Sequence, residues 1–339
     1  MTTATRIVLA SRPKGDATLD DFRTETAQIP APDDGELALR TIWLSLDPYM
    51  RGRMNDGPSY AAATEIGEVM TGEVVAEVTE SRDPRFVAGD IVLARIGWTT
   101  HGIVRGAEAR KLDPDLAPVS TALGVLGMPG QTAWIGLNEI LKMQRGETLV
   151  VGAATGAVGG VAGQLAKRAG LKTVGIAGGS EKCAYAVENL GYDVCLDHRD
   201  PDLAQELEAL TPQGVDCYFE NVGGKVLEAV LPRMNQDGRI AICGMVAWYS
   251  PEGLQNPPTL PPVWRTILTK RLRVQGFLVF DHADKLQPFL DEVGPLVGGG
   301  DLHYRESVAE GLEAAPQAFL DMLKGGNFGK QLVRVVADA

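Results

Sequence analysis

The chain has 339 residues, which is enough for about two domains with cores of their own. Its hydrophobic fraction of 45% and charged fraction of 22% are typical of a soluble globular protein. The formal net charge of −12 argues against nucleic acids and anionic membranes as partners, because both are bound by basic faces.

The sequence contains no clear targeting segment, membrane span or paired cysteine motif. The apolar run 7–10 is too short for a signal-peptide core, and no run approaches transmembrane length, so we expect no membrane partner. The four cysteines are scattered and form no CxxC pair, which indicates neither a zinc knuckle nor a disulfide framework. These features predict a cytoplasmic enzyme.

Short strands are predicted for the first 125 or so residues. The segments 36–44, 71–78 and 90–94 lie between Gly, Pro and Asp turns, and no helical pattern appears among them. From about Gly146 the pattern changes to alternating strands and helices. The predicted strands are 148–152, 172–177, 193–196, 215–219, 238–243 and 273–279, and the predicted helices are 158–169, 181–190, 201–210 and 224–235. Such alternation is typical of an α/β fold with a doubly wound parallel sheet of the Rossmann type.

The C-terminal segment follows the glycine run 298–300. It is predicted to contain a strand, a helix over 308–324 and a final strand over 331–336. Because it resembles neither a further Rossmann unit nor a tail, we expect it to complete the N-terminal domain. The predicted domains are therefore 1–125 with 301–339, and 126–300.

A glycine-containing turn connects the first strand and helix of the second domain. Its spacing is Ala154-x-Gly156-x-x-Gly159, with alanine where the first glycine of the usual fingerprint stands. A strand, a turn of small residues and a helix N-terminus form a cradle for the pyrophosphate of a dinucleotide, because the helix supplies unpaired N–H groups. The alternative is a glycine-rich turn in another kind of α/β protein.

The end of the second strand indicates which dinucleotide binds. NAD enzymes usually place a carboxylate there, whereas the strand 173–177 runs into Gly178-Gly179-Ser180-Glu181-Lys182. Ser180 and Lys182 would bond a 2′-phosphate, so we expect NADPH rather than NADH. Glu181 compensates the helix dipole, and Lys182 has an alternative role as a solvated helix residue.

Several longer motifs resemble the zinc-free medium-chain dehydrogenase/reductases, in particular the prostaglandin reductase / 2-alkenal reductase (leukotriene hydroxydehydrogenase-like) branch. The resemblance covers essentially the whole chain and rests on these segments: Leu46-Asp47-Pro48-Tyr49-Met50-Arg51, Gly97-Trp98-Thr99-Thr100-His101, Gly127-Met128-Pro129-Gly130-Gln131-Thr132-Ala133, Gly156-Ala157-Val158-Gly159, 216–224, 238–244 and Asn327-Phe328-Gly329-Lys330. It implies a β-rich GroES-like barrel domain, a Rossmann domain and a homodimer. It also implies reduction of the C=C bond of α,β-unsaturated aldehydes and ketones by NADPH.

The resemblance carries the family's cofactor contacts onto this chain. They are Gly156, Ala157, Val158, Gly159, Lys182, Asn221, the Cys243-Gly244 loop as far as Tyr249, Phe277, Leu278, Val279 and Asn327. Animal members have a tyrosine where this chain has His198. Histidine still donates to a phosphate and Arg199 is adjacent, so the expectation of NADPH stands. At Thr269 some members also have a tyrosine, which would alter the substrate range.

A catalytic zinc is not expected, because residues 1–125 contain no cysteine and one histidine, His101. The carbonyl oxygen of an enone must then be polarised by hydrogen bonds, and a neutral phenol suits this role. Tyr49, expected at a loop edge after Asp47-Pro48, and Tyr249, at the carboxyl edge of the sheet, are the candidates. Each could instead be a packing residue.

Other residues carry weaker hypotheses. Arg51 and Arg53 could bind an acidic substrate tail, but pairing with surface carboxylates is favoured. His101 is expected to be a structural hydrogen-bonder, and Trp248 rather than Trp98 to line an apolar pocket. Asn221 is expected to end a strand near the cofactor, and its alternative role is to cap the Gly223-Gly224 turn. The Pro-rich loop 256–262 is expected to be a lid over the site, a brace for a dimer partner or an exposed connector. Rival functions are a zinc-free quinone reductase and a non-catalytic NADPH-binding redox sensor.

Overall fold

The computed structural model describes residues 1–57, 59–249, 254 and 259–336. The chain divides into two compact units, which are described separately. The first comprises Met1–Gly124 with Glu306–Ala339, and the second comprises Val125–Arg305.

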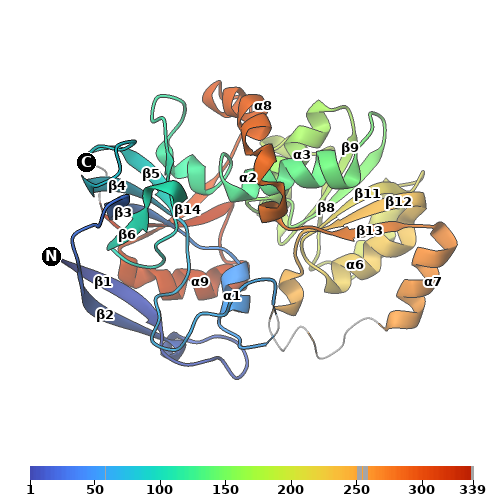
Figure 1. Cartoon of the computed structure of the whole chain (residues 1–339). Coiled ribbons are helices and arrows are strands. Elements are labelled where there is room, and N and C mark those ends of the chain that lie inside the picture. The colour runs from blue at the N-terminus through green and yellow to red at the C-terminus, as the bar shows by residue number, and fades with distance from the viewer. Residues whose placement is uncertain (58, 250–253, 255–258, 337–339) are drawn as a thin grey trace. The chain divides into compact units, whose positions relative to one another are not determined.

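The second unit is built on a parallel sheet (Figure 1). Its strands are β8 (Thr148–Gly152), β9 (Lys172–Ala177), β10 (Val194–Asp197), β11 (Val215–Glu220), β12 (Met234–Ile242) and β13 (Arg273–Gly276). Their order is β10-β9-β8-β11-β12-β13. From β8 at the centre, the chain first adds β9 and β10 on one side of the sheet. It then returns to the centre and adds β11, β12 and β13 on the other side. The predicted doubly wound fold is confirmed, and its reversal point lies between β8 and β11, where such folds bind ligands.

Helices connect these strands and cover both faces of the sheet. They are α3 (Gly159–Arg168), α4 (Ser180–Glu188), α5 (Leu203–Leu210) and α6 (Gly224–Val230), and Figure 1 shows α3 and α6 on opposite faces. Every residue of β8 is buried, as expected for a strand covered on both sides. The predicted strand 273–279 is too long, because β13 ends at Gly276.

Three helices of this unit were not predicted. They are α2 (Met128–Ile135), which continues as a π-helical turn (Gly136–Leu141), α7 (Leu260–Lys270) and α8 (Leu286–Gly298). α2 is buried from Pro129 to its end, so it lacks the amphipathic period that identifies a surface helix. The second half of the expected Pro-rich loop is the first turn of α7, where proline is well tolerated, whereas 256–258 lie outside the described residues. Among the described residues, no helix has the length and apolar character that a membrane crossing requires.

The first unit contains a mixed sheet and a separate hairpin. The hairpin is β1 (Thr2–Leu9) with β2 (Phe22–Ile29). The sheet has the order β14-β15-β3-β4-β5-β7, and β6 also pairs with β3. The bounds are β3 (Glu36–Ser45), β4 (Val74–Ser81), β5 (Ile91–Ala94), β6 (His101–Arg105), β7 (Arg110–Lys111), β14 (Glu306–Glu310) and β15 (Lys330–Arg334). β15 pairs antiparallel with β3, so the C-terminal segment joins the sheet of the N-terminal residues.

Two features of the C-terminal segment differ from the sequence prediction. The helix does not begin at residue 308, because β14 continues to Glu310 and Gly311 turns the chain with a φ of 82°. The helix is α9 (Ala315–Leu323), with Pro316 in its first turn. In addition, residues 301–305 group with the second unit, where the backbone N–H of His303 donates to Gln164 Oε1 at 2.8 Å.

A short helix, α1 (Tyr49–Arg53), lies where the sequence indicated only strands and turns. Pro48 precedes it with φ −58° and ψ −30°, values that already belong to a helix. Tyr49 therefore starts a helical turn and does not lie at a loop edge. Behind α1, the core of this unit contains Trp98, which stacks on Phe22 at 5.6 Å and meets Phe319 edge-on at 5.6 Å. Trp98 is thus a core residue.

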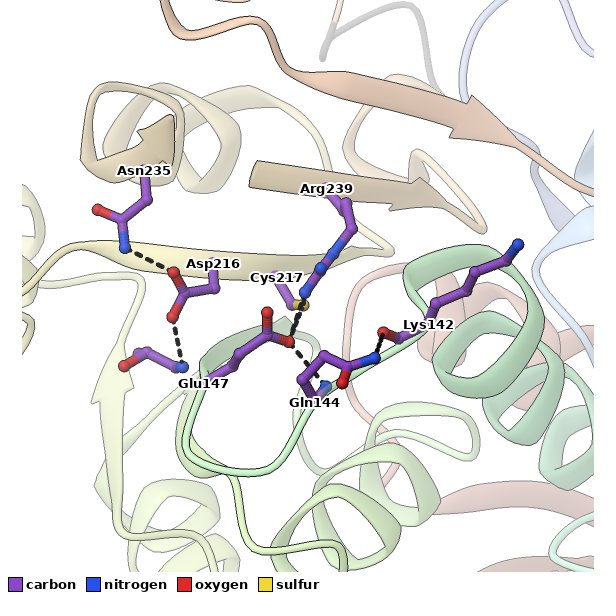
Figure 2. A network of polar contacts seen from close by, with 8 residues as sticks. Lys142, Gln144, Glu147, Asp216, Cys217, Asn235 and Arg239 are labelled. Atoms are coloured by element: carbon purple, nitrogen blue, oxygen red, sulfur yellow. Dashed lines mark hydrogen bonds and ion pairs between the residues drawn. The ribbon is translucent and has the colours of Figure 1, made fainter. Parts of the chain in front are cut away.

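A polar network lies at the amino-terminal ends of the central strands of the second unit (Figure 2). Glu147 accepts hydrogen bonds from the Gln144 N–H at 2.8 Å and from the Arg239 guanidinium. Arg239 also donates to Cys217 Sγ at 2.8 Å, and Asp216 accepts from the Thr148 N–H at 2.9 Å. This network ties β8, β11 and β12 together at the edge opposite to the one where ligands bind in such sheets.

Candidate active site

The glycine turn lies between β8 and α3 and is tightly packed on itself. Gly156 donates its N–H to the Ala153 carbonyl at 2.9 Å, and a Cβ on Gly159 would lie 2.3 Å from the same oxygen. Only glycine fits at position 159 without moving the backbone. Ala153 has a φ of 52°, a left-handed conformation that costs a residue with a Cβ about 1–3 kcal/mol. Gly156, Ala157, Val158 and Gly159 are thus placed at the N-terminus of α3, where N–H groups lack helical partners.

A buried tyrosine outside the predicted site supports this turn. Tyr192 donates its hydroxyl hydrogen to the Gly159 carbonyl at 2.7 Å. Its ring fits against α3 because position 163 is glycine: a Cβ there would lie 2.0 Å from the ring. This close contact between helix and neighbouring chain is the packing role expected of a glycine in such a fingerprint. The sequence signal for it was Gly163 in the middle of an otherwise favourable helix.

Basic side chains converge beyond the ends of β9 and β10. The His198 ring lies over Gly178, where a Cβ would be 2.7 Å from Nε2, and the Arg199 guanidinium lies over Gly179, where a Cβ would be 3.2 Å from Nη1. Burial lowers the pKa of Lys182, and the charge of Arg199 lowers it further. Burial also lowers the pKa of His198, and Arg199 and Lys182 act in the same direction. Ser180 opens α4 beside them, so these residues form a compact site for an anion.

One acidic residue lies within this cationic group and was given no role from the sequence. Asp197 ends β10, and its carboxylate accepts the backbone N–H of Arg199 at 2.9 Å. Burial raises its pKa, but hydrogen bonds from the backbone of Arg199 and Gly179 outweigh that effect and leave the pKa lowered. Asp197 therefore acts on the backbone of the turn.

The ends of β11 and β8 are joined by the side chain of Asn221, whose Nδ2 donates to the Gly152 carbonyl at 2.9 Å. Asn221 therefore caps the end of β8 rather than the Gly223-Gly224 turn. Glu220 was missed: its Oε1 accepts from the Val222 N–H at 2.6 Å and from the Gly223 N–H at 2.9 Å. The sequence feature that could have indicated this role is the position of Glu220 between an apolar strand and the pair Gly223-Gly224.

The loop after β12 contains Cys243, Gly244 and Tyr249. The Cys243 N–H donates to the Glu220 carbonyl at 2.9 Å, and burial raises the pKa of the Cys243 thiol to about 12. Tyr249 folds back over the loop, because its hydroxyl oxygen accepts the Met245 N–H at 3.4 Å. Trp248 covers Gly223, where a Cβ would lie 2.9 Å from the indole ring.

The predicted contacts after β13 divide into packing and loop positions. Phe277 lies edge-on to Phe219, with ring centroids 6.3 Å apart, so its ring belongs to the packing beneath the sheet edge. Leu278 and Val279 begin the following 3-10 turn, where the Leu278 carbonyl accepts the Asp281 N–H at 3.1 Å.

The first unit holds Tyr49 beside a buried ion pair. Burial raises the pKa of the Tyr49 phenol, and the negative charges of Asp47 and Glu73 raise it further. The phenol is therefore neutral at pH 7 and able to donate a hydrogen bond. Asp47 pairs with Lys330 at 2.7 Å, with side chains 7% and 5% exposed. Asn327 lies in the same unit and donates from Nδ2 to the Gly329 carbonyl at 2.8 Å.

The arginines of α1 contradict the expectation of surface ion pairs. Arg51 and Arg53 are only 3% and 7% exposed, and Arg51 donates to Asn55 Oδ1 at 2.8 Å and to the Gly15 carbonyl at 2.8 Å. His101, by contrast, is confirmed as a structural hydrogen-bonder, with Nδ1 3.1 Å from Thr100 Oγ1. Thr269 is exposed on α7 and bonds back to the Arg265 carbonyl at 2.8 Å. Within the described part of the chain, no three His, Cys, Asp or Glu side chains are grouped as metal ligands.

Two family models match most of the chain. Residues 5–112 match the N-terminal domain of oxidoreductase, and residues 157–293 match a model described as zinc-binding dehydrogenase. The NADPH-dependent curcumin reductase of Escherichia coli is 48% identical over 98% of this chain and 97% of its own length. The NADP(+)-dependent 2-alkenal reductase of Nicotiana tabacum is 40% identical over 93% of this chain and 92% of its own length.

A solved structure is similar over almost the whole chain. CurA from Vibrio vulnificus, in complex with NADPH, is 44% identical with a TM-score of 0.94 and covers 98% of this chain and 100% of its own. The order of the parallel strands, the glycine turn and these relatives agree. The chain belongs to the zinc-free medium-chain dehydrogenase/reductases, in the branch of NADP-dependent oxidoreductases that contains the prostaglandin reductases and the 2-alkenal reductases.

Proposed function

We propose that this chain reduces the C=C bond of small α,β-unsaturated aldehydes and ketones with NADPH, without a metal. The observation that carries the proposal is the group of basic side chains beyond β9 and β10, together with relatives named as NADPH-dependent curcumin and 2-alkenal reductases. A 2′-phosphate distinguishes NADPH from NADH, and a cationic site is the chemistry that selects it.

The residues present fit NADPH. The charge of Arg199 lowers the pKa of Lys182, so a dianionic phosphate beside these two residues would relieve that repulsion. His198, whose pKa is lowered, is neutral at pH 7 and can still donate a ring N–H to a phosphate oxygen. Ser180 adds a hydroxyl donor, and the N-terminus of α3 with Gly156–Gly159 would hold the pyrophosphate. Asn221, the loop 243–249, 277–279 and Asn327 would hold the rest of the dinucleotide. When bound, NADPH supplies the hydride.

The chain's own contribution to the chemistry is to hold the carbonyl oxygen of the substrate. Tyr49 is a neutral phenol at pH 7, because burial and nearby carboxylates raise its pKa. The Tyr249 hydroxyl oxygen accepts the Met245 N–H, and a neutral phenol is chemically able to accept one hydrogen bond and donate another. A hydrogen bond to the carbonyl oxygen stabilises the negative charge that develops there, and losing such a donor costs roughly 3–4 kcal/mol in the barrier.

A substrate panel tests the reaction. NADPH oxidation is followed with medium-chain enals and enones and, as separate arms, with quinones. Turnover of enals and enones but not quinones supports the proposal, whereas turnover of quinones alone identifies a quinone reductase. Tight NADPH binding without turnover of any acceptor identifies a redox sensor. If Tyr49→Phe and Tyr249→Phe both keep near-full turnover of a small enone, the assigned hydrogen bonds are wrong.

Cofactor preference tests the cationic site. Lys182→Ala is expected to raise the KM for NADPH and to spare NADH, and the ratio should shift about 10- to 150-fold, because a charged hydrogen bond contributes roughly 1.5–3 kcal/mol. Lys225→Ala is the matched control, since Lys225 is exposed on α6. An equal shift in the control, or no shift in Lys182→Ala, removes Lys182 from the site.

We also propose a homodimer formed through the exposed edge of the second unit. Every residue of β13 is exposed along that edge, and α7 exposes Leu260, Trp264 and Leu268 at a spacing of four residues. Unpaired strand edges and apolar stripes both favour association, and a second copy supplies the matching edge. Leu268→Glu is expected to yield monomers in sedimentation, and an unchanged dimer places the interface elsewhere. A cytoplasmic location stays a prediction from the sequence.

A further inference from the structure

Glu220 is a buried carboxylate at the carboxyl end of β11. The residue is 3% exposed, and no lysine or arginine of the described part of the chain pairs with it. Its Oε2 atom is buried without a hydrogen-bond partner. Burial raises the pKa of its carboxyl group, so the ionised form is unfavourable for folding. The packing of the sheet therefore does not explain why an acid stands at this position.

The carboxylate holds the turn that follows the strand. Its Oε1 accepts the Val222 N–H at 2.6 Å and the Gly223 N–H at 2.9 Å. Gly223 has a φ of 79°, a conformation that favours glycine, and the two successive N–H groups point to the same oxygen. Hydrogen bonds to an ionised acceptor are roughly twice as strong as those to a neutral one. The charge of Glu220 therefore fixes the shape of the turn 221–223.

Two segments of the candidate site are attached to this turn. The Asn221 carbonyl accepts the Val246 N–H at 3.2 Å. The Val222 carbonyl accepts the Ala247 N–H at 2.9 Å, so the loop 243–249 is hydrogen-bonded to two successive residues of the turn. The side chain of Asn221 donates to the end of β8. A change in the shape of the turn is therefore transmitted both to that loop and to the contact with β8.

The place of the turn in the sheet indicates which part of the dinucleotide it meets. The basic site for the 2′-phosphate lies beyond β9 and β10, and the glycine turn after β8 is the site proposed for the pyrophosphate. A dinucleotide that follows the sheet edge in this order brings its nicotinamide half to the ends of β11 and β12. The turn 221–223 and the loop 243–249 follow these two strands.

We infer that Glu220 is a positioning residue for the nicotinamide half of the dinucleotide. Its carboxylate holds the turn 221–223, and with it the loop 243–249, in the arrangement that binds that half. The inference rests on the proposed function for the course of NADPH along the sheet edge. Because Glu220 acts through the turn, its loss should weaken the binding of one half of the dinucleotide and spare the other.

A matched pair of ligands tests this division by titration calorimetry, without any acceptor. NADPH contains both halves, whereas adenosine 2′,5′-bisphosphate contains the 2′-phosphate and the adenosine but no nicotinamide. Glu220→Met fills the space of the side chain and removes the acceptor. The Kd of NADPH should rise about tenfold or more, because two N–H groups lose their charged partner. The Kd of the bisphosphate should stay within about twofold of wild type, whereas Lys182→Ala should weaken the binding of both ligands.

Two further variants separate positioning from a structural role. Glu220→Gln keeps a neutral oxygen acceptor, so its Kd for NADPH should rise about threefold or more and lie between those of wild type and Glu220→Met. The ratio of NADPH affinity to NADH affinity should stay unchanged in both variants, because the two dinucleotides share the same nicotinamide half. Glu228→Gln, which changes an exposed acid of α6, should alter none of these affinities.

Two results would overturn the inference. One is a folded Glu220→Met whose Kd for NADPH stays within about twofold of wild type, and Glu220→Gln decides by the same criterion if Glu220→Met does not fold. The other is an equal loss of affinity for NADPH and for adenosine 2′,5′-bisphosphate, which shows a structural role in the whole unit. If wild type binds NADPH but reduces no acceptor, the proposed reductase function fails, and the two Kd values still decide the role of Glu220.

Discussion

The buried ion pair between Lys330 and Asp47 allows a quantitative prediction. Lys330 Nζ donates to Asp47 Oδ1 and to the Leu46 carbonyl, both at 2.7 Å, and Ser45 donates to the second carboxylate oxygen. Both charged side chains are nearly inaccessible to water, at 5% and 7% exposed. Lys330→Met keeps most of the side-chain volume but leaves the carboxylate without its counter-charge.

The expected destabilisation follows from the burial of the pair. Removing one partner of a buried pair costs about 3–5 kcal/mol, because the other charge stays buried and uncompensated. Lys330→Met should therefore lower the free energy of unfolding by about 3–5 kcal/mol at pH 7.

Urea unfolding at pH 7 measures this by tryptophan fluorescence, to which Trp98 in the core of the first unit contributes. The control is Arg82→Met, because Arg82 belongs to an exposed pair with Glu80 in the same unit and should change stability by less than about 1 kcal/mol. The double variant Asp47→Asn/Lys330→Met should be more stable at pH 7 than Lys330→Met alone.

Two outcomes would refute the reasoning about this pair. A loss in Lys330→Met no larger than in Arg82→Met would show that the pair is hydrated in solution. A double variant that is no more stable than Lys330→Met would show that the loss arises from packing, because removing the orphaned charge would then recover nothing.

The remaining predictions concern single groups. Burial raises the pKa of the Glu306 carboxyl above its unfolded value, so its ionisation destabilises the fold; Glu306→Gln should be more stable than wild type at pH 7, with the difference vanishing below about pH 4 in urea titrations. Gly163→Ala should cost about 1–3 kcal/mol in thermal unfolding, since a Cβ meets the Tyr192 ring; a more stable variant would contradict the packing. Burial raises the pKa of the Cys217 thiol to about 12, so it should resist alkylation until the protein unfolds (Figure 2); labelling faster than unfolding would show an open network.

The sequence alone predicted the sheet of the second unit well. The strands 148–152 and 172–177 match β8 and β9 residue for residue, because strands covered on both faces are short apolar runs between glycine turns. The helix α2 was not predicted, for a related reason. A helix buried on all sides has no polar face, and its sequence then shows no helical period.

The sequence predicted which residues belong to the candidate site, but it did not predict how they are arranged in space. Lys182 follows β9 and His198 follows β10, and their meeting depends on the pairing of these two strands in the sheet. Arg53 was interpreted as a surface cation, because a charged residue among polar neighbours gives no sign that folding will bury it.

The sequence by itself determined the features that depend on neighbouring residues: the strands, the glycine turns and the residue types that suit a dinucleotide. The tertiary structure decided which charges are buried and which meet. Lys330 lies 283 positions from Asp47, and β15 must pair with β3 before the two can form an ion pair. Such contacts depend on the closure of long loops around a shared core, and no periodicity or motif in the sequence records that.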